Sequence, residues 1–174
     1  DSATGVMSFV AAPDYETKTA YSATVTATDG VFASSELVSI EVINLNDNAP
    51  IVTSATNFIV DENETSIGTA SATDADGDTL TYSISGSEIS IDSATGVMSF
   101  VAAPDYETKA AYSATLVVRD GVFTTTEELS ITINDLNDNN PVFNTSNNFL
   151  VPEEETFIGT IQATDADANT QVIY

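Results

Sequence analysis

The sequence PDYETK stands at residues 13–18 and again at residues 104–109, so the chain repeats itself after 91 residues. The same interval carries LNDN from residues 45–48 to residues 136–139. Residues 1–49 and 92–140 are identical at 34 of 49 aligned positions. A fixed interval of this kind indicates one structural unit copied in tandem.

The repeat interval divides the chain of 174 residues into three parts. Residues 1–49 match the second part of one repeat, residues 50–140 form a complete repeat, and residues 141–174 match the first part of a third. We therefore expect tandem domains in an elongated array, with each end of this sequence lying inside a domain.

Within the complete repeat, apolar and polar residues alternate as they do in half-buried β-strands. This alternation predicts strands at residues 57–60, 66–73, 80–84, 89–91, 97–101, 112–118 and 129–133. Turn residues such as Gly77, Gly86 and Gly121 separate them. About seven strands without a helical period predict an all-β fold, an antiparallel sandwich of two sheets.

The composition excludes several classes of function. The formal net charge is −24, from 3 Lys and Arg residues against 27 Asp and Glu residues, and the chain has no His and no Cys. So little positive charge argues against binding to nucleic acid or to an anionic membrane surface. Without His and Cys the usual general base and most transition-metal ligands are missing, so we expect no enzyme. No apolar run approaches the roughly 18 residues of a membrane span, so no membrane insertion is expected.

Acidic residues occur as short spaced pairs within the expected loops. Asp74 and Asp76 are two residues apart, as are Asp105 and Glu107, so in an extended chain each pair points the same way. Two carboxylates about 4 Å apart repel by roughly 4 kcal/mol at an effective dielectric constant near 20, and a bound cation removes this repulsion. A merely solvating acidic surface is the simpler alternative, but it would scatter acids over the exposed strand faces.

Calcium is the cation that fits these ligands, because it accepts about 6–8 oxygen atoms in flexible geometry. An EF-hand loop counted from Asp74 requires Gly at its sixth position and Glu at its twelfth, where this sequence has Thr79 and Ser85. The ligands must therefore come from several loops. A sandwich gathers its loops at its two poles, so we expect the ions between domains.

Several motifs, occurring together and in order, resemble those of the cadherin repeat. Residues 133–141 are similar to the cadherin linker, residues 60–63 to its Pro-Glu-Asn element, and residues 105–107 to its Asp-Arg-Glu element. Residues 74–76 are similar to the Asp-Xaa-Asp element, and Asp120 matches the later single Asp. The resemblance covers the whole chain. It implies tandem Greek-key β-sandwiches of immunoglobulin-like topology with Ca²⁺ between them.

The resemblance also implies a set of ligands for each junction between repeats. For the later junction it implies Glu62, Asp105, Glu107, Asp135, Asn137, Asp138, Asn139, Asp165 and Asp167. For the earlier junction it implies Asp14, Glu16, Asn46, Asp47, Asn48, Asp74, Asp76 and Asp120. Glu153 takes the role of Glu62 in the third repeat. Asn44 stands where the linker's first Asp is expected, which removes one negative charge and is expected to weaken one ion site.

The function that this resemblance implies is a calcium-stiffened extracellular or cell-surface rod in cell adhesion or surface or matrix assembly. Its expected partners are calcium ions and other cadherin-like repeats of the same or neighbouring chains. The alternative is a carbohydrate-binding module of a polysaccharide-associated protein, although the chain has no Trp. An enzyme acting through a carboxylate pair such as Asp105 and Glu107 is not expected, because metal binding explains the pair better. Low Lys content, absent Cys and near-identical repeats suggest a microbial adhesin or matrix protein.

Other motifs are explained by structure or by chance. Residues 63–65 and 144–146 are formal N-glycosylation sequences, but so short a pattern often arises by chance. The aromatic residues among apolar positions are expected in the core rather than on a sugar-binding platform. They are Tyr82, Phe100, Tyr112 and Phe123.

The two ends of the sequence carry complementary parts of one repeat. Only the equivalents of residues 84–91 are missing between the tail and the head. We expect this sequence to be an excerpt of a longer chain. Alternatively, the tail of one molecule pairs with the head of the next and brings Glu153 beside Asp14 and Glu16. In both cases the two halves are predicted to dock as one sandwich across a chain boundary.

Overall fold

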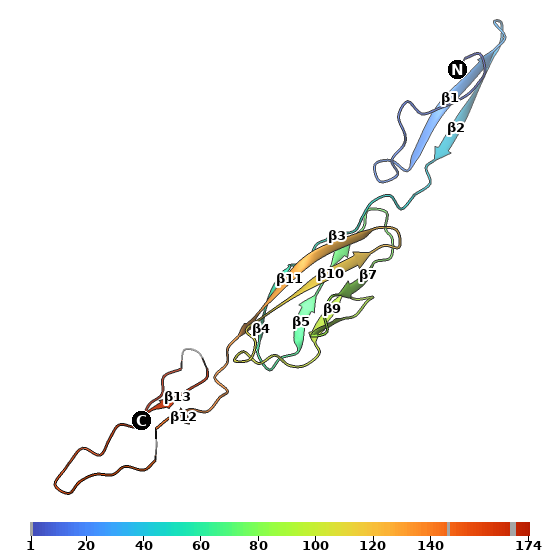
Figure 1. The fold of residues 1–174 in the computed structure, drawn as a ribbon. Coiled ribbons are helices and arrows are strands. Elements are labelled where there is room, and N and C mark those ends of the chain that lie inside the picture. The colour runs from blue at the N-terminus through green and yellow to red at the C-terminus, as the bar shows by residue number, and fades with distance from the viewer. Residues whose placement is uncertain (1, 146, 168–169) are drawn as a thin grey trace.

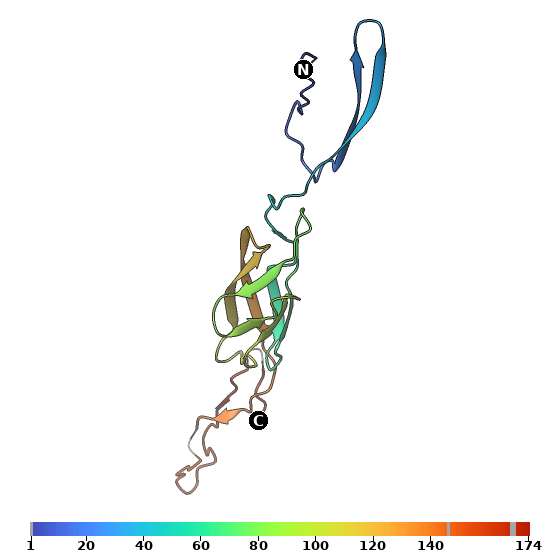
Figure 2. The same ribbon diagram turned by 90° about the vertical axis from the view of Figure 1, so that its right-hand side faces the viewer.

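The computed structural model describes residues 2–145, 147–167 and 170–174. The molecule is elongated in both views, with a central β-sandwich between two smaller units (Figures 1 and 2). The N-terminal and C-terminal units lie at opposite ends of this sandwich, as the tandem repeats predict. Among the described residues, no helix is long and apolar enough to cross a membrane.

The central unit is built from two β-sheets. The larger sheet has the strand order β4-β11-β10-β7 and the smaller has the order β5-β9-β8, while β3 pairs with β6. The strands are β3 (Ile51–Val52), β4 (Asn57–Asp61), β5 (Ser66–Thr69), β6 (Ala72–Thr73), β7 (Thr81–Ile84), β8 (Ile89–Ile91), β9 (Val97–Phe100), β10 (Ala111–Arg119) and β11 (Thr124–Asn134). The all-β sandwich expected from the sequence is confirmed.

One strand pairing differs from the expected antiparallel arrangement. β10 and β11 form an antiparallel hairpin, but β11 and β4 are parallel, with Ser130 opposite Asn57 and Asn134 opposite Asp61. The reason is that both strands run toward the same pole. β4 delivers Glu62 to this pole, and β11 leads into the linker that follows Asn134. The parallel pairing therefore brings Glu62 beside the start of the linker.

The single strand expected over residues 66–73 is divided into β5 and β6. β5 pairs with β9 in the smaller sheet, whereas β6 pairs with β3. The division occurs at Ala70, whose N–H donates a 2.9 Å hydrogen bond to the carbonyl oxygen of Gly96 in a turn. β6 is thereby directed to the pole where Asp74 and Asp76 follow it.

The core lies between the two sheets and uses the alternating positions of the long hairpin. Leu116 and Val118 of β10 and Ile131 of β11 are fully buried against Met98 of β9. Phe100 is buried, and Tyr82 and Tyr112 pack against this core as expected. Phe123 is an exception, because it lies in the β10–β11 turn and its side chain is 36% exposed.

The two end units repeat parts of the central sandwich. In the N-terminal unit β1 (Ala20–Thr28) pairs with β2 (Ala33–Glu41), and Tyr21 lies opposite Ile40 as Tyr112 lies opposite Ile131. In the C-terminal unit β12 (Val142–Phe143) pairs with β13 (Ala163–Thr164) in the register of β3 and β6.

Both end units expose side chains that are buried in the central unit. Met7 is 55% exposed, whereas its equivalent Met98 is completely buried. The two end units of one chain lie apart from each other. The docking of two such half-repeats across a chain boundary therefore stays a prediction.

The close approach at Gly96 generates a test of the sandwich. Gly96 has a φ of +72°, and a Cβ atom there would collide with the backbone oxygen of Ala70. Gly86 has a φ of +86°, but its missing side chain faces open space. Either substitution by Ala forces a side chain into the left-handed region at a cost of about 1–2 kcal/mol. We expect Gly96→Ala to lower the free energy of unfolding by a further 1–3 kcal/mol or so, because it also overpacks the turn.

Urea unfolding followed by tyrosine fluorescence measures this difference, with Gly86→Ala as the matched control. Equal destabilisation by the two substitutions would mean that the contact between Gly96 and Ala70 does not hold β5 and β6 in place.

Candidate metal centres

The acidic residues gather at the two ends of the central sandwich, where linkers meet loops. We call the linker of residues 42–50 with its surrounding loops the first junction. We call the linker of residues 135–141 with its surrounding loops the second junction. Each junction brings together the pole of one repeat, a linker and the opposite pole of the next repeat.

Glu62 is a buried residue whose hydrogen bonds hold the second junction together. Its side chain is 1% exposed, and both carboxylate oxygens accept backbone hydrogen bonds. Oε1 accepts from the N–H of Leu136 at 2.7 Å, and Oε2 accepts from the N–H of Tyr106 at 2.8 Å. Because these partners belong to the linker and to the segment of residues 105–107, this one buried carboxylate fixes both segments relative to β4.

Two clusters of three carboxylates lie at the second junction, and Glu107 belongs to both. In each cluster the carboxylate oxygens lie within 4.8 Å of one another. One cluster combines Glu62 and Glu107 with Asp138 of the linker, and the other combines Glu107 and Asp135 with Asp167 of the next repeat. The second cluster therefore spans the junction.

The pKa shifts reflect this crowding of negative charge. Desolvation, together with the nearby charges of Glu62 and Asp167, raises the pKa of Glu107 above its ordinary value. Desolvation also acts to raise the pKa of Asp167, but hydrogen bonds donated by the side chain and backbone of Asn139 lower it overall. Asp167 is thus held as a carboxylate, whereas the negative charges around Glu107 oppose its ionisation.

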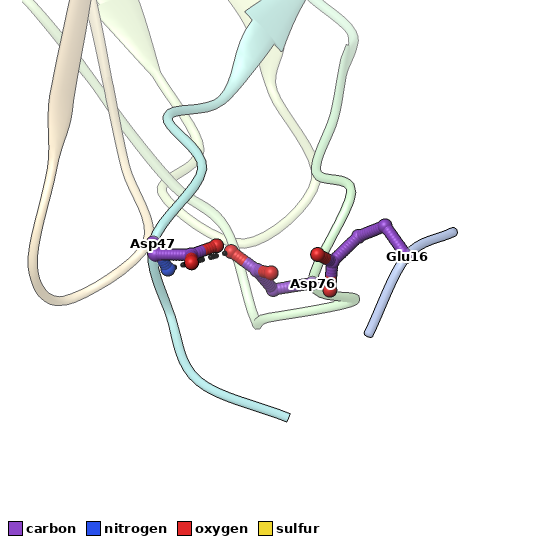
Figure 3. Close-up of side chains that lie close together, drawn as sticks. All are labelled: Glu16, Asp47 and Asp76. Atoms are coloured by element: carbon purple, nitrogen blue, oxygen red, sulfur yellow. Dashed lines mark hydrogen bonds between the residues drawn. The ribbon is translucent and has the colours of Figure 1, made fainter. Parts of the chain in front are cut away.

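The first junction has an equivalent arrangement centred on Asp76. Its Oδ2 accepts from the backbone N–H groups of Asp47 at 3.1 Å and Asn48 at 2.9 Å, and the Asn48 side chain donates to Oδ1. Figure 3 shows Glu16, Asp47 and Asp76 converging from three separate segments, and their carboxylate oxygens lie within 4.8 Å of one another. This cluster therefore draws on both repeats and on the linker.

Asp78 is a member of the first junction that the sequence analysis missed. It clusters with Asp74 and Asp76, and the Oδ1 atom of Asp74 accepts hydrogen bonds from the N–H groups of Asp76 and Asp78. Desolvation and the charges of Asp74 and Asp76 raise its pKa. The signal was present, because Asp78 continues the spacing of two residues that singled out its neighbours.

Asp120 approaches this cluster from the β10–β11 turn. Its side chain is 8% exposed, and Oδ1 accepts from the N–H groups of Val122 at 2.7 Å and Phe123 at 2.6 Å. Desolvation acts to raise the pKa of Asp120, but these hydrogen bonds lower it overall. The Asn46 side chain donates to the Asp120 carbonyl oxygen at 3.5 Å and thereby connects the linker to this turn.

Buried oxygen atoms without hydrogen-bond partners mark both junctions. They are Oδ1 of Asn44, Oδ1 of Asn46, Oδ2 of Asp74, Oδ2 of Asp120, and Oδ1 and Oδ2 of Asp135. Among the described residues only one other side-chain atom, Oγ of Ser54, has this character. An unsatisfied buried polar group costs about 1–3 kcal/mol, and more when it is charged. A set made only of carboxylate and amide oxygens fits Ca²⁺, which takes such ligands.

Other expected ligands lie beside these clusters rather than within them. Asp14 and Asp105 each accept hydrogen bonds within their own turns, from Glu16 and Thr17 and from Thr108 respectively. Asp165 accepts from the N–H of Asp167, as Asp74 does from Asp76. Asn139 donates to Asp138 and Asp167. Asn137 and Glu153 are exposed, and the three-acid clusters found among the described residues include neither Asp14, Asp105, Asp165 nor Glu153.

Asn63 has a role at the second junction that its motif did not indicate. Its Nδ2 donates a 2.6 Å hydrogen bond to Oδ2 of Asp138, and its N–H donates to the Pro104 carbonyl oxygen. Its φ of +67° turns the chain so that both contacts form. The other N-glycosylation sequence ends at Ser146, which lies outside the described residues.

Curated relatives of the chain carry cadherin names. A scan against protein-family models gives no match. The Fat-like cadherin-related tumor suppressor homolog of Drosophila melanogaster is 34% identical over 184 residues, which are 95% of this chain and 4% of that protein. Cadherin EGF LAG seven-pass G-type receptor 2 of Mus musculus is 33% identical over 196 residues, which cover 100% of this chain and 7% of that protein. The chain thus spans a small part of these relatives.

Solved structures with a similar fold are stretches of extracellular cadherin domains. The protocadherin gammaB7 EC3–6 cis-dimer structure matches with a TM-score of 0.79 and 27% identity, over 90% of this chain and 46% of that chain. Mouse cadherin-23 EC22–24 matches with a TM-score of 0.70 and 27% identity, over 90% of this chain and 57% of that chain. With the all-β sandwich and the repeated acidic motifs, these likenesses show that the chain belongs to the cadherin repeat family.

Proposed function

We propose that this chain is part of an extracellular rod of tandem cadherin repeats, stiffened by calcium, that acts in cell adhesion or in surface or matrix assembly. In this proposal residues 50–140 are one complete repeat, and residues 1–49 and 141–174 are parts of its neighbours. One observation carries the proposal: buried oxygen atoms without partners gather at both junctions, where two repeats and a linker meet.

The proposed ligands come from both sides of each junction. At the second junction they are Glu62, Asp105, Glu107, Asp135, Asn137, Asp138, Asn139, Asp165 and Asp167. At the first they are Asp14, Glu16, Asn46, Asp47, Asn48, Asp74, Asp76, Asp78 and Asp120. Glu153 is the proposed equivalent of Glu62 for the repeat that starts at residue 141.

Electrostatics gives the mechanism of stiffening. Unit charges on carboxylate oxygens within 4.8 Å repel by about 3.5 kcal/mol or more per pair at an effective dielectric constant near 20. Bound Ca²⁺ supplies positive charge and accepts several oxygens at once. Because Glu107, Asp135 and Asp167 come from one repeat, the linker and the next repeat, the residues hold a single angle between domains only when this repulsion is neutralised.

The proposed location follows from the calcium concentration that such sites need. Extracellular calcium modules have dissociation constants of about 0.1–1 mM, so they are loaded outside a cell and empty inside it. At tenfold excess over the dissociation constant, each ion stabilises the loaded state by about 1.4 kcal/mol. The proposed partners are therefore calcium ions and other cadherin repeats, of the same chain or of neighbouring chains.

The alternative carbohydrate-binding function has no support from the comparisons or from the surface. A hollow on the C-terminal unit is lined by Phe143, Phe149 and Ile161 among others. Their equivalents in the complete repeat are Val52, Phe58 and Ala70, which belong to the core or pack against it. The hollow is thus an uncovered core face rather than a platform for sugar rings. The relatives named above are animal proteins, which gives no support to the suggested microbial origin.

Small-angle X-ray scattering during a calcium titration tests the proposed function. We expect the radius of gyration to rise and to reach a plateau over about 0.1–1 mM Ca²⁺, because loaded junctions hold the rod extended. Chelation should reverse the change, and the same concentration of Mg²⁺ should reproduce little of it. Identical scattering curves in chelator and in millimolar calcium would contradict the proposal.

Asp138→Ala tests the ligands of the second junction. We expect the calcium affinity of this junction to fall about tenfold or more, because Asp138 joins Glu62 and Glu107 in one cluster. The sandwich of residues 50–140 should keep its thermal stability in chelator, since Asp138 lies outside its core. Glu127→Ala is the matched control, because Glu127 is an exposed acid of β11 that belongs to none of the clusters found among the described residues. Isothermal titration calorimetry that gives the same calcium affinity for both variants would exclude Asp138 as a ligand.

A further inference from the structure

The two junctions differ at one equivalent position of their linkers. Asn44 begins the acidic part of the first linker, and Asp135 occupies the same place in the second, 91 residues later. Both side chains are half-buried and both carry buried oxygen atoms without hydrogen-bond partners. The chemical difference is that an amide donates hydrogen bonds, whereas a carboxylate only accepts them.

Among the described residues, the side chain of Asp135 has no hydrogen-bond partner across its junction. Both of its carboxylate oxygens are buried without partners, and one of them lies within 4.8 Å of a carboxylate oxygen of Glu107 and of one of Asp167. A buried carboxylate between two other acids is unfavourable until a cation neutralises it. Asp135 therefore contributes to alignment of the second junction only when calcium is bound.

Asn44 connects its junction without a metal ion. Its Nδ2 donates a 2.8 Å, part-buried hydrogen bond to the backbone oxygen of Asp76, in the repeat that follows the linker. It brings no negative charge to the cluster of Glu16 and Asp76. Its Oδ1 remains a neutral ligand for calcium. At this linker position the first junction therefore has a hydrogen bond from linker to repeat that, among the described residues, the second junction lacks, and it has less repulsion between carboxylates across the junction.

Asp78 gives back to the first junction the negative charge that is lost at Asn44, but it does not give back the repulsion between the two domains. The equivalent residue in the third repeat is Asn169, so the first junction loses a charge at Asn44 and gains one at Asp78. The acids that act on Asp78 are Asp74, Asp76 and Asp120, which all belong to the same repeat as Asp78. The added repulsion is thus contained within one pole and does not push the two domains apart.

We propose that the residue at this linker position sets how strongly each junction depends on calcium. Asn44 keeps the first junction aligned at calcium concentrations at which the second junction has already loosened around Asp135. This inference rests on the proposed function, because it assumes that calcium loads both junctions. When the calcium concentration falls, such a rod bends first at the junctions that carry Asp at this linker position.

Reciprocal substitutions with a readout at each junction test the proposal. The chain has no Cys, so pairs of spin labels can be attached at introduced cysteines without a competing site. The pair Thr24→Cys and Thr126→Cys reports the first junction, and Thr126→Cys with Thr160→Cys reports the second, all at exposed positions. Pulsed electron paramagnetic resonance then gives the width of each interspin distance distribution across a calcium titration.

In calcium-free buffer we expect the population of misaligned conformations to be about fivefold smaller at the first junction, the factor that one net hydrogen bond supplies. In calcium-free buffer, Asn44→Asp should broaden the interspin distance distribution of the first junction. This distribution should narrow only when calcium is added. Asp135→Asn should narrow the calcium-free distribution at the second junction. Each variant is compared with the parent chain at the same junction, so other differences between the junctions cancel.

Distributions that stay unchanged in both variants, while calcium still narrows both junctions of the parent chain, would overturn the inference and leave the proposed function standing. Failure of calcium to narrow either junction of the parent chain would instead overturn the proposed function, and this inference with it. Circular dichroism in chelator confirms that each variant retains its β-sandwich before the distances are compared.

Discussion

Repulsion among carboxylates held within 4.8 Å of one another is the constraint on which the arrangement of the repeats depends. Glu62 is satisfied inside the second junction by backbone N–H groups of Tyr106 and Leu136. Asp135 lacks any such partner although both of its carboxylate oxygens are buried. The two kinds of acid therefore have different roles. Acids with hydrogen-bond partners position the loops and the linker, and buried acids without partners are stabilised only when a cation binds.

The sandwich supplies the rigid scaffold that brings these acids together. β4 and β11 run in parallel to the same pole, so Glu62 and the start of the second linker are fixed side by side. β3 and β6 pair at the other pole and place Asp74 and Asp76 against the first linker. The core between the sheets, centred on Met98, Leu116 and Ile131, keeps the two poles at a constant separation.

Much of this arrangement could be predicted from the sequence. The period-two alternation is a local signal, and the 91-residue repeat is found by comparing the sequence with itself. The parallel pairing of β11 with β4 could not, since it depends on which pole each strand runs toward. Phe123 resembled a core residue by its neighbours but lies in a turn fixed by Asp120. The contacts of Asn63 with Asp138 and of Asn44 with Asp76 are long-range hydrogen bonds, which spacing along the chain does not reveal.

A crystal structure grown in calcium, with anomalous scattering data that locate the calcium ions, would show directly whether cations join the repeats. We expect ions at both junctions, bonded at about 2.3–2.6 Å to oxygen atoms that are now buried without partners, including those of Asp135 and Asp120. We also expect Glu107 to bind more than one ion, because it belongs to two clusters. Junctions without anomalous peaks, with these carboxylates dispersed into solvent, would contradict this expectation.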